Sequence, residues 1–337
     1  MITTSFSVTL AGGRDFETSK PRKRMIAIQR YTPDRKSEWN QFVAESKNGT
    51  FLFDRCYMDY HSDRFHDHSL MFYVDGRLLA VLPAHVDGDT LYTHRGLTYG
   101  GLLMSSQLTI AETMMLFHEL NELLRSEGLK HVCYKAIPWI YHNLAAEEDL
   151  YALYHECKAR ITARDYSTCI FLGAHLRWER VRRRGIHRAQ QAGIRVTISD
   201  GYADFWRVLA DNLSAKYGVK PVHTLGEIEL LHSRFPRNIV LYQAEHEGRV
   251  VGGVVLYITP QVVHAQYSSA TPEGKKLGAI DAIYDRIMHE DYKDYPYFDF
   301  GRSTENPDGS GLNATLVFQK EGFGARGLCY DIYEYDL

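Results

Sequence analysis

Hydrophobic and polar positions near the C-terminal end of the chain alternate between strand patterns and helix patterns. Two apolar runs, at 239–244 and 250–258, flank Glu247-Gly248, a dipeptide typical of a tight β-hairpin turn. A third strand is expected at 262–268. These three segments predict consecutive strands of one sheet.

A turn with two glycines follows at 273–279, and it opens a helix. The helix is predicted from apolar residues at helical spacing, which are Ile280, Ile283, Tyr284 and Ile287. Another strand is expected at 297–300, and a closing helix within 313–324. Backbone N–H groups converge on an anion where a strand feeds a glycine-containing turn and a helix N-terminus. The order therefore predicts an anion site at 273–279.

The chain carries this pattern twice. Segment 72–82 resembles segment 243–254, because both contain an acidic-Gly-Arg turn between two strands of similar length. The first copy continues with a strand at 90–93, an amphipathic helix at 109–126 and a strand at 131–136. The agreement of the helix and strand that follow favours a duplicated α/β unit. Hairpins that match by chance are the alternative, since Asp-Gly and Glu-Gly turns are common.

Residues 1–24 differ from the rest of the chain. They are polar, rich in Ser and Thr, and end in a basic cluster at 20–24, without the apolar core of a secretory signal. We therefore expect a disordered N-terminal extension.

Composition narrows the classes of protein. A chain of 337 residues, 45 % of them hydrophobic, can bury one large or two medium cores. The net charge of −3 offers no global attraction to nucleic acid or an anionic membrane, and no apolar run approaches the roughly 20 residues of a membrane span. The five scattered cysteines lack CxxC spacing, which favours reduced thiols and a cytoplasmic location.

One segment between the two copies, 176–193, is densely basic. Its arginines are Arg177, Arg180, Arg182, Arg183, Arg184 and Arg188. Gly193 suits the end of a helix before a strand at 194–198. The segment is either a helix that faces the phosphates of a nucleotide, cofactor or lipid carrier, or a solvated helix face that pairs with acidic neighbours.

The ordered set of motifs resembles the FemABX-like branch of the GNAT acyltransferase superfamily. The resemblance rests on Arg188-Ala189 and Gly193-Ile194 after the basic segment, on the duplicated unit, and on the closing Lys-Glu-Gly-Phe-Gly at 320–324. That branch includes peptidoglycan aminoacyl transferases and many bacterial acyltransferases of unassigned substrate.

The resemblance implies an α/β fold with two tandem GNAT-like units, each a mixed, mostly antiparallel sheet flanked by helices. We expect the extension at 1–24, an N-terminal unit at 25–165, and a C-terminal unit with the cofactor loop at 166–337.

The resemblance also implies that the turn at 273–279 holds the pyrophosphate of acetyl-CoA or another acyl-CoA, used as a co-substrate. The usual phosphate loop is only approximated here, by Lys-Leu-Gly-Ala at 276–279 and by Gly274. Small residues let a backbone approach a pyrophosphate, although Gly278 and Ala279 would equally let a helix pack closely on a sheet. The candidate cofactor-binding residues are Gly274, Lys275, Lys276, Gly278 and Ala279.

Many GNAT enzymes carry a tyrosine in the closing helix that can protonate the departing thiolate. This chain has Phe318 there, so that acid is missing, although a thiolate with a pKa of about 8.5 is a tolerable leaving group. Lys320, which the FemABX-like branch keeps, could stabilise negative charge on the donor or the tetrahedral intermediate. A base could be Glu305 or His223. The candidate catalytic residues are Lys320, Glu305, His223 and Tyr267.

Side chains at three places are expected to line the substrate cleft. The strand at 262–268 puts His264 and Ser268 on one face and Tyr267 on the other, beside the thioester in the implied arrangement. The strand at 297–300 ends where α/β sheets place ligands. The glycine-rich turn at 95–101 either lines the cleft from the first unit or is a tight structural turn. The candidate substrate-binding residues are Arg95, Tyr99, His264, Ser268, Arg302 and Ser303.

No metal site is expected. His61, His66, Asp67 and His68 lie close together in the sequence but lack a distant partner at a zinc-like interval, so they are interpreted as surface residues.

Three functions remain open. The first is an N-acyltransferase that moves an acyl group, such as acetyl from acetyl-CoA, to an amine on a small molecule or a cell-envelope sugar or peptide precursor. The second is an aminoacyl-tRNA-dependent peptidoglycan-type aminoacyl transferase, although the acidic net charge argues against an extensive tRNA surface. The third is a non-catalytic ligand-binding member of the fold, which the loss of the acid at Phe318 would explain.

Overall fold

The computed structural model describes residues 25–174 and 176–337, so the extension expected at 1–24 lies outside it. The N-terminal half contains β1 Ile26–Arg30, α1 Lys36–Glu45, α2 Arg55–Met58, β2 Leu70–Val74, β3 Arg77–Leu82, β4 His85–Asp87, β5 Thr90–Tyr92, β6 Leu103–Met104, α3 Ile110–Ser126, β7 His131–Lys135, α4 Glu148–His155 and β8 Arg160–Phe171. The C-terminal half contains α5 Arg180–Gln191, β9 Arg195–Ser199, α6 Ala203–Tyr217, α7 Leu225–Arg234, β10 Ile239–His246, β11 Arg249–Ile258, β12 Val262–Ala270, α8 Pro272–Leu277, α9 Ala279–Arg286, β13 Tyr297–Arg302, α10 Ala314–Glu321 and β14 Arg326–Asp336.

Both halves follow the same order of elements, and the repeated pattern predicted the hairpin and the strand, helix and strand that follow it in each half. In each, a strand and two helices precede a hairpin, and a long helical segment then leads to a strand, a short helix and a last long strand. The hairpin turns Asp75-Gly76 and Glu247-Gly248 have positive φ at both residues, the conformation that matches the twist of paired strands. The two predicted hairpins are therefore confirmed.

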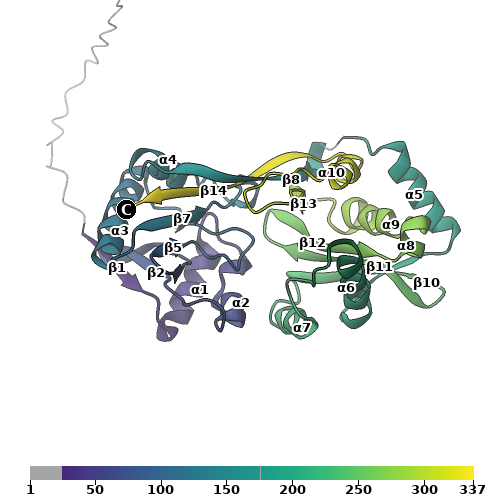
Figure 1. The fold of residues 1–337 in the computed structure, drawn as a ribbon, viewed down its shortest axis with the longest axis horizontal. Coiled ribbons are helices and arrows are strands. Elements are labelled where there is room, and N and C mark those ends of the chain that lie inside the picture. The colour runs from purple at the N-terminus through teal and green to yellow at the C-terminus, as the bar shows by residue number, and fades with distance from the viewer. Residues whose placement is uncertain (1–24, 175) are drawn as a thin grey trace, which may run out of the picture.

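The last strand of each half lies beside the other half. The larger sheet has the order β4-β5-β7-β14-β8-β13-β12-β11-β10-β9, and a second sheet has the order β1-β2-β3-β6. Strand β14 lies between β7 and β8, and β8 lies between β14 and β13. Figure 1 shows these two strands running along one side of both halves. The boundary expected between residues 165 and 166 thus falls inside β8, and each half completes the sheet of the other.

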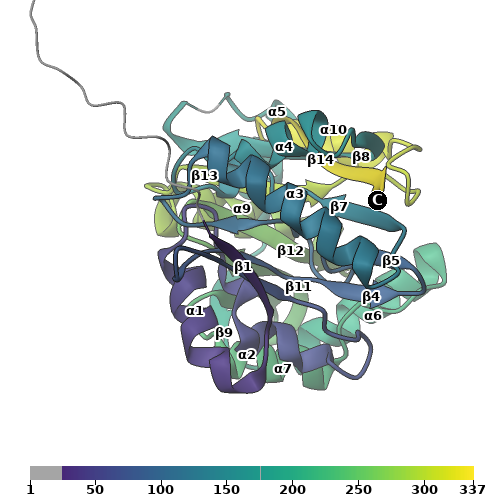
Figure 2. The ribbon, with the colours of Figure 1, turned by 90° about the vertical axis from the view of Figure 1, so that its left-hand side faces the viewer.

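Helices and aromatic side chains cover these sheets. Helix α3 begins with a capping box between Thr109 and Glu112 and buries its apolar face on the N-terminal strands, across which it lies in Figure 2. One hydrophobic core spans both halves and includes Tyr57, Tyr99 and Tyr257. The junction between the halves is therefore packed with aromatic rings. None of the described helices is long and apolar enough to cross a membrane.

Strands β12 and β13 form a fork. They pair in parallel only from Val262 to His264, opposite 297–299, while β12 continues to Ala270. A β-bulge shifts the register of β12, so that Ala265 pairs with Leu256 but Tyr267 pairs with Val255. The extra residue moves Tyr267 onto the face of His264, and Ser268 onto the opposite face. The sequence-based assignment of His264 and Ser268 to one face, with Tyr267 on the other, was therefore wrong.

Candidate functional site

A buried carboxylate lies where the fork opens. Asp299 of β13 is fully buried and faces His264, whose Nδ1–H donates to Oδ2 at 2.9 Å. The hydroxyls of Tyr141 and Tyr330 donate to the same oxygen, the former at 2.7 Å. Oδ1 accepts from the Ser167 hydroxyl and from the Gly301 backbone N–H, both at 2.9 Å. The carboxylate is thus held by five donors from both halves of the chain.

These contacts fix the ionisation of the carboxylate. Burial alone would raise the pKa of Asp299, but its attraction to the protonated form of His264 and the hydrogen bonds hold that pKa well below its usual value. In the neutral form of His264, Nδ1 carries the proton that Asp299 accepts, so the lone pair is at Nε2. Gly301 lies in front of this ring, and a Cβ there would lie 3.2 Å from its Cε1. The pair therefore provides a basic nitrogen beside the fork.

A second acid–base pair lies on the same face of β12. The Tyr267 hydroxyl lies 2.5 Å from Nδ1 of His223, and the Tyr267 ring contacts Trp206 edge-on. Burial lowers the pKa of His223 to about 4, so its imidazole is neutral near pH 7, and burial also raises the pKa of Tyr267. The structure thus brings together two of the four predicted catalytic residues.

Lys320 is the third predicted catalytic residue, and its ammonium is engaged within the protein. Nζ donates to the carbonyls of Gly301 and Arg302 at 2.7 and 2.9 Å, and to Oγ of Ser303 at 2.8 Å. Burial lowers its pKa to about 8, so it stays largely protonated at neutral pH. An ammonium has three donors. All three N–H donors of Lys320 are used here in hydrogen bonds that stabilise the end of β13.

The remaining predicted site residues lie at different depths. Tyr99 and Ser303 are buried. Tyr99 lies in the glycine-rich turn at 95–101, and its hydroxyl donates to the Thr50 hydroxyl. Ser268 is exposed, as is Glu305, which accepts from Asn313 at 2.9 Å. A small space between the halves, too narrow for water, is lined by Tyr99 and His264 among others. Tyr99 and His264 therefore meet at the junction, whereas Glu305 lies on a surface loop.

Two predicted arginines gather near a lysine that the sequence did not reveal. Burial and the nearby Arg302 lower the pKa of Lys135 to about 8, and Arg95 adds to this effect. The ammonium of Lys135 donates to the Leu97 carbonyl at 2.7 Å. Arg95 pairs with Asp87 at 2.9 Å and Arg302 with Asp165 at 2.7 Å, and about half of each arginine side chain is exposed. Three cations thus lie together near the end of the fork.

The predicted cofactor turn is shaped by packing. Helix α8 has six residues, and Thr271 caps it by accepting from the Gly274 N–H at 3.0 Å. A Cβ on Gly274 would overlap the Val251 carbonyl, and one on Gly278 would overlap the backbone of Gly185 in α5. Ala279 is buried, and Lys275 and Lys276 are exposed. The two glycines are therefore required by close helix packing, which was the alternative left open for Gly278.

The histidines interpreted as surface residues divide into two groups. His66 is exposed, but His61 is buried and its ring lies 5.1 Å from that of His94, which lies 5.4 Å from His85. The sequence pattern did not reveal that His85 and His94, from a strand and a later turn, pack beside His61. The surface assignment was thus wrong for His61. No group of side chains able to hold a metal occurs among residues 25–174 and 176–337.

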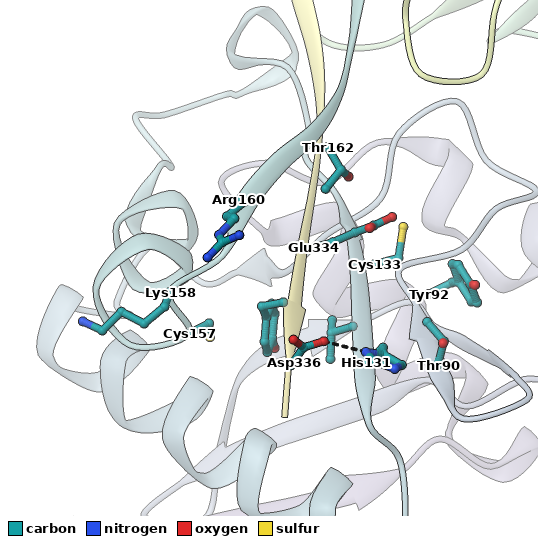
Figure 3. A pocket seen from close by; sticks show the side chains of 12 residues that line it. Thr90, Tyr92, His131, Cys133, Cys157, Lys158, Arg160, Thr162, Glu334 and Asp336 are labelled. Atoms are coloured by element: carbon teal, nitrogen blue, oxygen red, sulfur yellow. Dashed lines mark hydrogen bonds and ion pairs between the residues drawn. The ribbon is translucent and has the colours of Figure 1, made fainter.

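A larger cavity lies on the N-terminal half. It has a volume of about 530 Å³ and is open to solvent over one face of β5, β7, β14 and β8. Figure 3 shows Cys133 and Glu334 on adjacent strands, and the ion pair of His131 with Asp336 at 2.6 Å. The cavity therefore has a polar floor with charges of both signs.

Comparisons with known proteins agree with this architecture. Residues 177–307 match the model of the acetyltransferase (GNAT) domain. A crystal structure of FemX aligns with a TM-score of 0.65 at 12 % identity, over 92 % of this chain and 97 % of that one. No protein of curated function matches the chain in sequence.

Two further structures align over most of their length. One is the C-terminal domain of a putative lysylphosphatidylglycerol synthetase from Agrobacterium fabrum, with a TM-score of 0.58 at 10 % identity, over 90 % of this chain and 92 % of that one. The other is a tandem GNAT protein from the clavulanic acid biosynthesis pathway, with a TM-score of 0.50 at 12 % identity, over 93 % and 98 %.

The fold is that of the GNAT superfamily of acyltransferases. Within that superfamily it has the tandem, FemABX-like arrangement, as the alignment with FemX over nearly the whole chain shows. The predicted fold class and family resemblance are therefore confirmed.

Proposed function

We propose that this protein is an acyltransferase that moves an acyl group from an activated donor to an amine, with His264 as the general base. The His264–Asp299 pair carries this proposal. A base must have a free lone pair near the reacting amine, and Asp299 leaves the lone pair of His264 at Nε2. As the amine attacks the donor carbonyl, its proton passes to Nε2, and Asp299 stabilises the imidazolium that forms.

The leaving group receives its proton from Tyr267 in this proposal. Phe318 cannot supply one and is 61 % exposed. The Tyr267 hydroxyl lies on the His264 face of the same strand, and the neutral imidazole of His223 orients it. The tyrosinate left after the transfer regains its proton through solvent from the His264 imidazolium, which returns both groups to their starting state. Lys320 acts indirectly, because it holds the backbone of Gly301 in front of His264. The acceptor carries a phosphate or carboxylate, which Lys135, Arg95 and Arg302 attract.

Two donors are compatible with the fold. An acyl-CoA such as acetyl-CoA is the usual co-substrate of the superfamily that the chain resembles. An aminoacyl-tRNA, with a peptidoglycan-type precursor as acceptor, is the second candidate. One observation favours it: the N–H groups of Gly274 and Gly278 donate within the protein, to the Thr271 hydroxyl and to the Gly274 carbonyl, which leaves these two donors engaged rather than free for the pyrophosphate of CoA.

The test is a transfer assay with acetyl-CoA, longer acyl-CoAs and aminoacyl-tRNAs as donors, and amino sugars and nucleotide-linked peptides as acceptors. We expect His264→Gln to lose about 10²–10⁴-fold in kcat, the range typical of a general base. Ser268→Ala, on the opposite face of β12, is the control and should retain activity. Equal rates for wild type and His264→Gln would refute the assignment of the base. Binding of an acceptor without transfer from any donor would favour the non-catalytic alternative.

A further inference from the structure

The basic segment forms a helix with one strongly cationic face. Helix α5 spans Arg180–Gln191 and ends before Gly193, which has a φ of 69°. This confirms the predicted helix and its glycine terminus. Arg180, Arg183, Arg184 and Arg188 are exposed and recur three, four and eight residues from the first, so they share one face. Arg177 is also exposed, just before the helix.

The opposite face of α5 is fixed to the protein. Gly185 and Ala189 are buried, and a Cβ on Gly185 would overlap Asp281 of α9. Arg182 points to this side and pairs with Asp281 at 2.8 Å. The helix cannot rotate to hide its arginines, because its small residues lie directly against α9.

The exposed arginines are not explained as internal ion pairs. Among the described residues, no carboxylate forms a hydrogen bond or ion pair with the arginines of this face, whereas Arg195 and Arg207 elsewhere have acidic partners at 2.6 and 2.8 Å. The solvated-face alternative required acidic neighbours. Asp281 pairs with Arg182 on the packed side and attracts Arg188, but no ion pair holds Arg180, Arg183 or Arg184 in the described part of the chain. The net charge of the chain is −3, so the positive charge of α5 is local.

Exposed apolar side chains accompany the arginines. Val181 is 38 % exposed and precedes Arg184 by three residues in α5, so the two side chains are neighbours on the helix surface. Leu176, before the helix, is 47 % exposed. The start of α5 contacts the end of α10, where Glu179 N–H donates to the Gly322 carbonyl at 2.8 Å. One turn earlier in α10 is Phe318, 61 % exposed. Figure 1 shows α5 and α10 along the same side of the C-terminal half.

We propose that α5 and the adjoining end of α10 dock on the surface of an anionic lipid membrane. Arginines attract anionic headgroups, and exposed aliphatic and aromatic side chains gain free energy at the boundary between headgroups and acyl chains. A nucleic acid would use the arginines but offers no apolar boundary to Leu176 and Val181. The proposal goes beyond the acyl transfer proposed above and does not depend on it.

The test is sedimentation of the full chain with vesicles of phosphatidylglycerol and phosphatidylcholine in equal parts, and with phosphatidylcholine alone. We expect binding only to the anionic vesicles, with a loss as salt rises. Arg180→Glu with Arg184→Glu should weaken binding at least about thirtyfold, since each basic residue near the surface is worth about 1 kcal/mol. Arg207→Glu with Arg237→Glu changes the net charge equally on exposed positions elsewhere, and it should change binding less than about threefold.

A second variant distinguishes binding to lipid from binding to RNA. Val181→Ser with Phe318→Ser keeps every charge and should weaken vesicle binding several-fold while leaving any binding to an RNA hairpin unchanged. The proposal is overturned if wild type does not sediment with anionic vesicles, if the two charge-reversal variants lose equally, or if the RNA hairpin binds more tightly than vesicles at the same salt. Melting temperatures of the variants close to that of wild type establish that the fold is intact.

Discussion

The two halves contain the same parallel strand pair, yet only one pair is enclosed. In the C-terminal half, His264 pairs with Asp299 across β12 and β13. In the N-terminal half, Tyr92 pairs with Cys133 across β5 and β7, at the corresponding third position. Tyr141 of the N-terminal half covers the pair of His264 and Asp299. The pair of Tyr92 and Cys133 instead lines the open cavity, and the Arg95 guanidinium lies 3.5 Å above the Tyr92 ring.

This difference shows that two halves with the same strand arrangement need not carry the same reactive side chains. A hydrogen-bonded pair such as His264 and Asp299 interacts strongly only where water is excluded, and here the other half excludes it. The exchanged strands β8 and β14 hold the halves together, since Ser167 of β8 and Tyr330 of β14 both donate to Asp299. The enclosed site therefore depends on the tandem arrangement rather than on one unit.

The largest effect is expected from Asp299→Asn. The change removes a buried charge that five donors surround, and loss of one partner of a buried pair typically costs about 3–5 kcal/mol of unfolding free energy. If His264 is the base, kcat also falls by about 10³–10⁴-fold, because the imidazole loses its orienting carboxylate. Urea unfolding and a transfer assay measure the two effects.

The control for this comparison is Cys133→Ser, at the position of Asp299 in the other half. It should change the unfolding free energy by less than about 1.5 kcal/mol, because Cys133 lies in an open, polar cavity. Similar losses for both variants would mean that the two strand pairs are energetically equivalent, contrary to the comparison.

The next effect concerns Lys320→Met. The variant leaves the Gly301 and Arg302 carbonyls and the Ser303 hydroxyl without their shared donor, and each unsatisfied buried group costs about 1–3 kcal/mol. We expect the unfolding free energy to fall by several kcal/mol, together with the rate of transfer. A stable variant that has lost only activity would instead support the direct role predicted from the sequence, in which the ammonium faces the reacting charge.

Much of this architecture could be predicted from the sequence because it depends on local patterns. The Asp75-Gly76 and Glu247-Gly248 hairpins, the end of α5 at Gly193 and the repeated element order follow from turn chemistry and periodicity. Contacts between distant segments could not be predicted in this way. The bulge that moved Tyr267, and the meeting of Tyr141 and Tyr330 at Asp299, depend on tertiary pairing. A charge inside the apolar strand at 297–300 was the available signal for Asp299.

A smaller effect separates two glycines with the same backbone conformation. Gly278→Ala adds a methyl group that overlaps the backbone of Gly185, at a φ of 85°. Overpacking of this kind costs about 1–3 kcal/mol, in addition to about 1–2 kcal/mol of backbone strain. Gly76→Ala, at a φ of 79° in the N-terminal hairpin, has nothing within 4 Å and should show the strain alone. Equal destabilisation of the two variants in urea would show that α5 does not pack closely against the backbone at Gly278.

The smallest effect is a change in how stability depends on pH. Burial lowers the pKa of His85 to about 4, with Arg95 opposing its charge, and unlike His264 it has no hydrogen-bonded carboxylate in the described structure. Asp87, Lys135 and His61 also act on this imidazole. In the unfolded chain a histidine titrates near 6.5. Between pH 6.5 and 4 the unfolded state therefore binds a proton that the folded state does not, and stability falls as the pH is lowered, by up to about 1.4 kcal/mol per pH unit.

His85→Phe removes the titrating imidazole but keeps an aromatic ring in contact with Phe65 and Tyr92. We measure the free energy of unfolding by urea titration between pH 4.5 and 6. Its slope against pH should become shallower by up to about 1.4 kcal/mol per pH unit, which corresponds to the binding of one proton. Near pH 8 the variant should show no such change in slope, because His85 is neutral in both states there. An unchanged slope at acid pH would mean that His85 is charged in the folded protein, and that the N-terminal half provides the imidazole with an acidic partner after all.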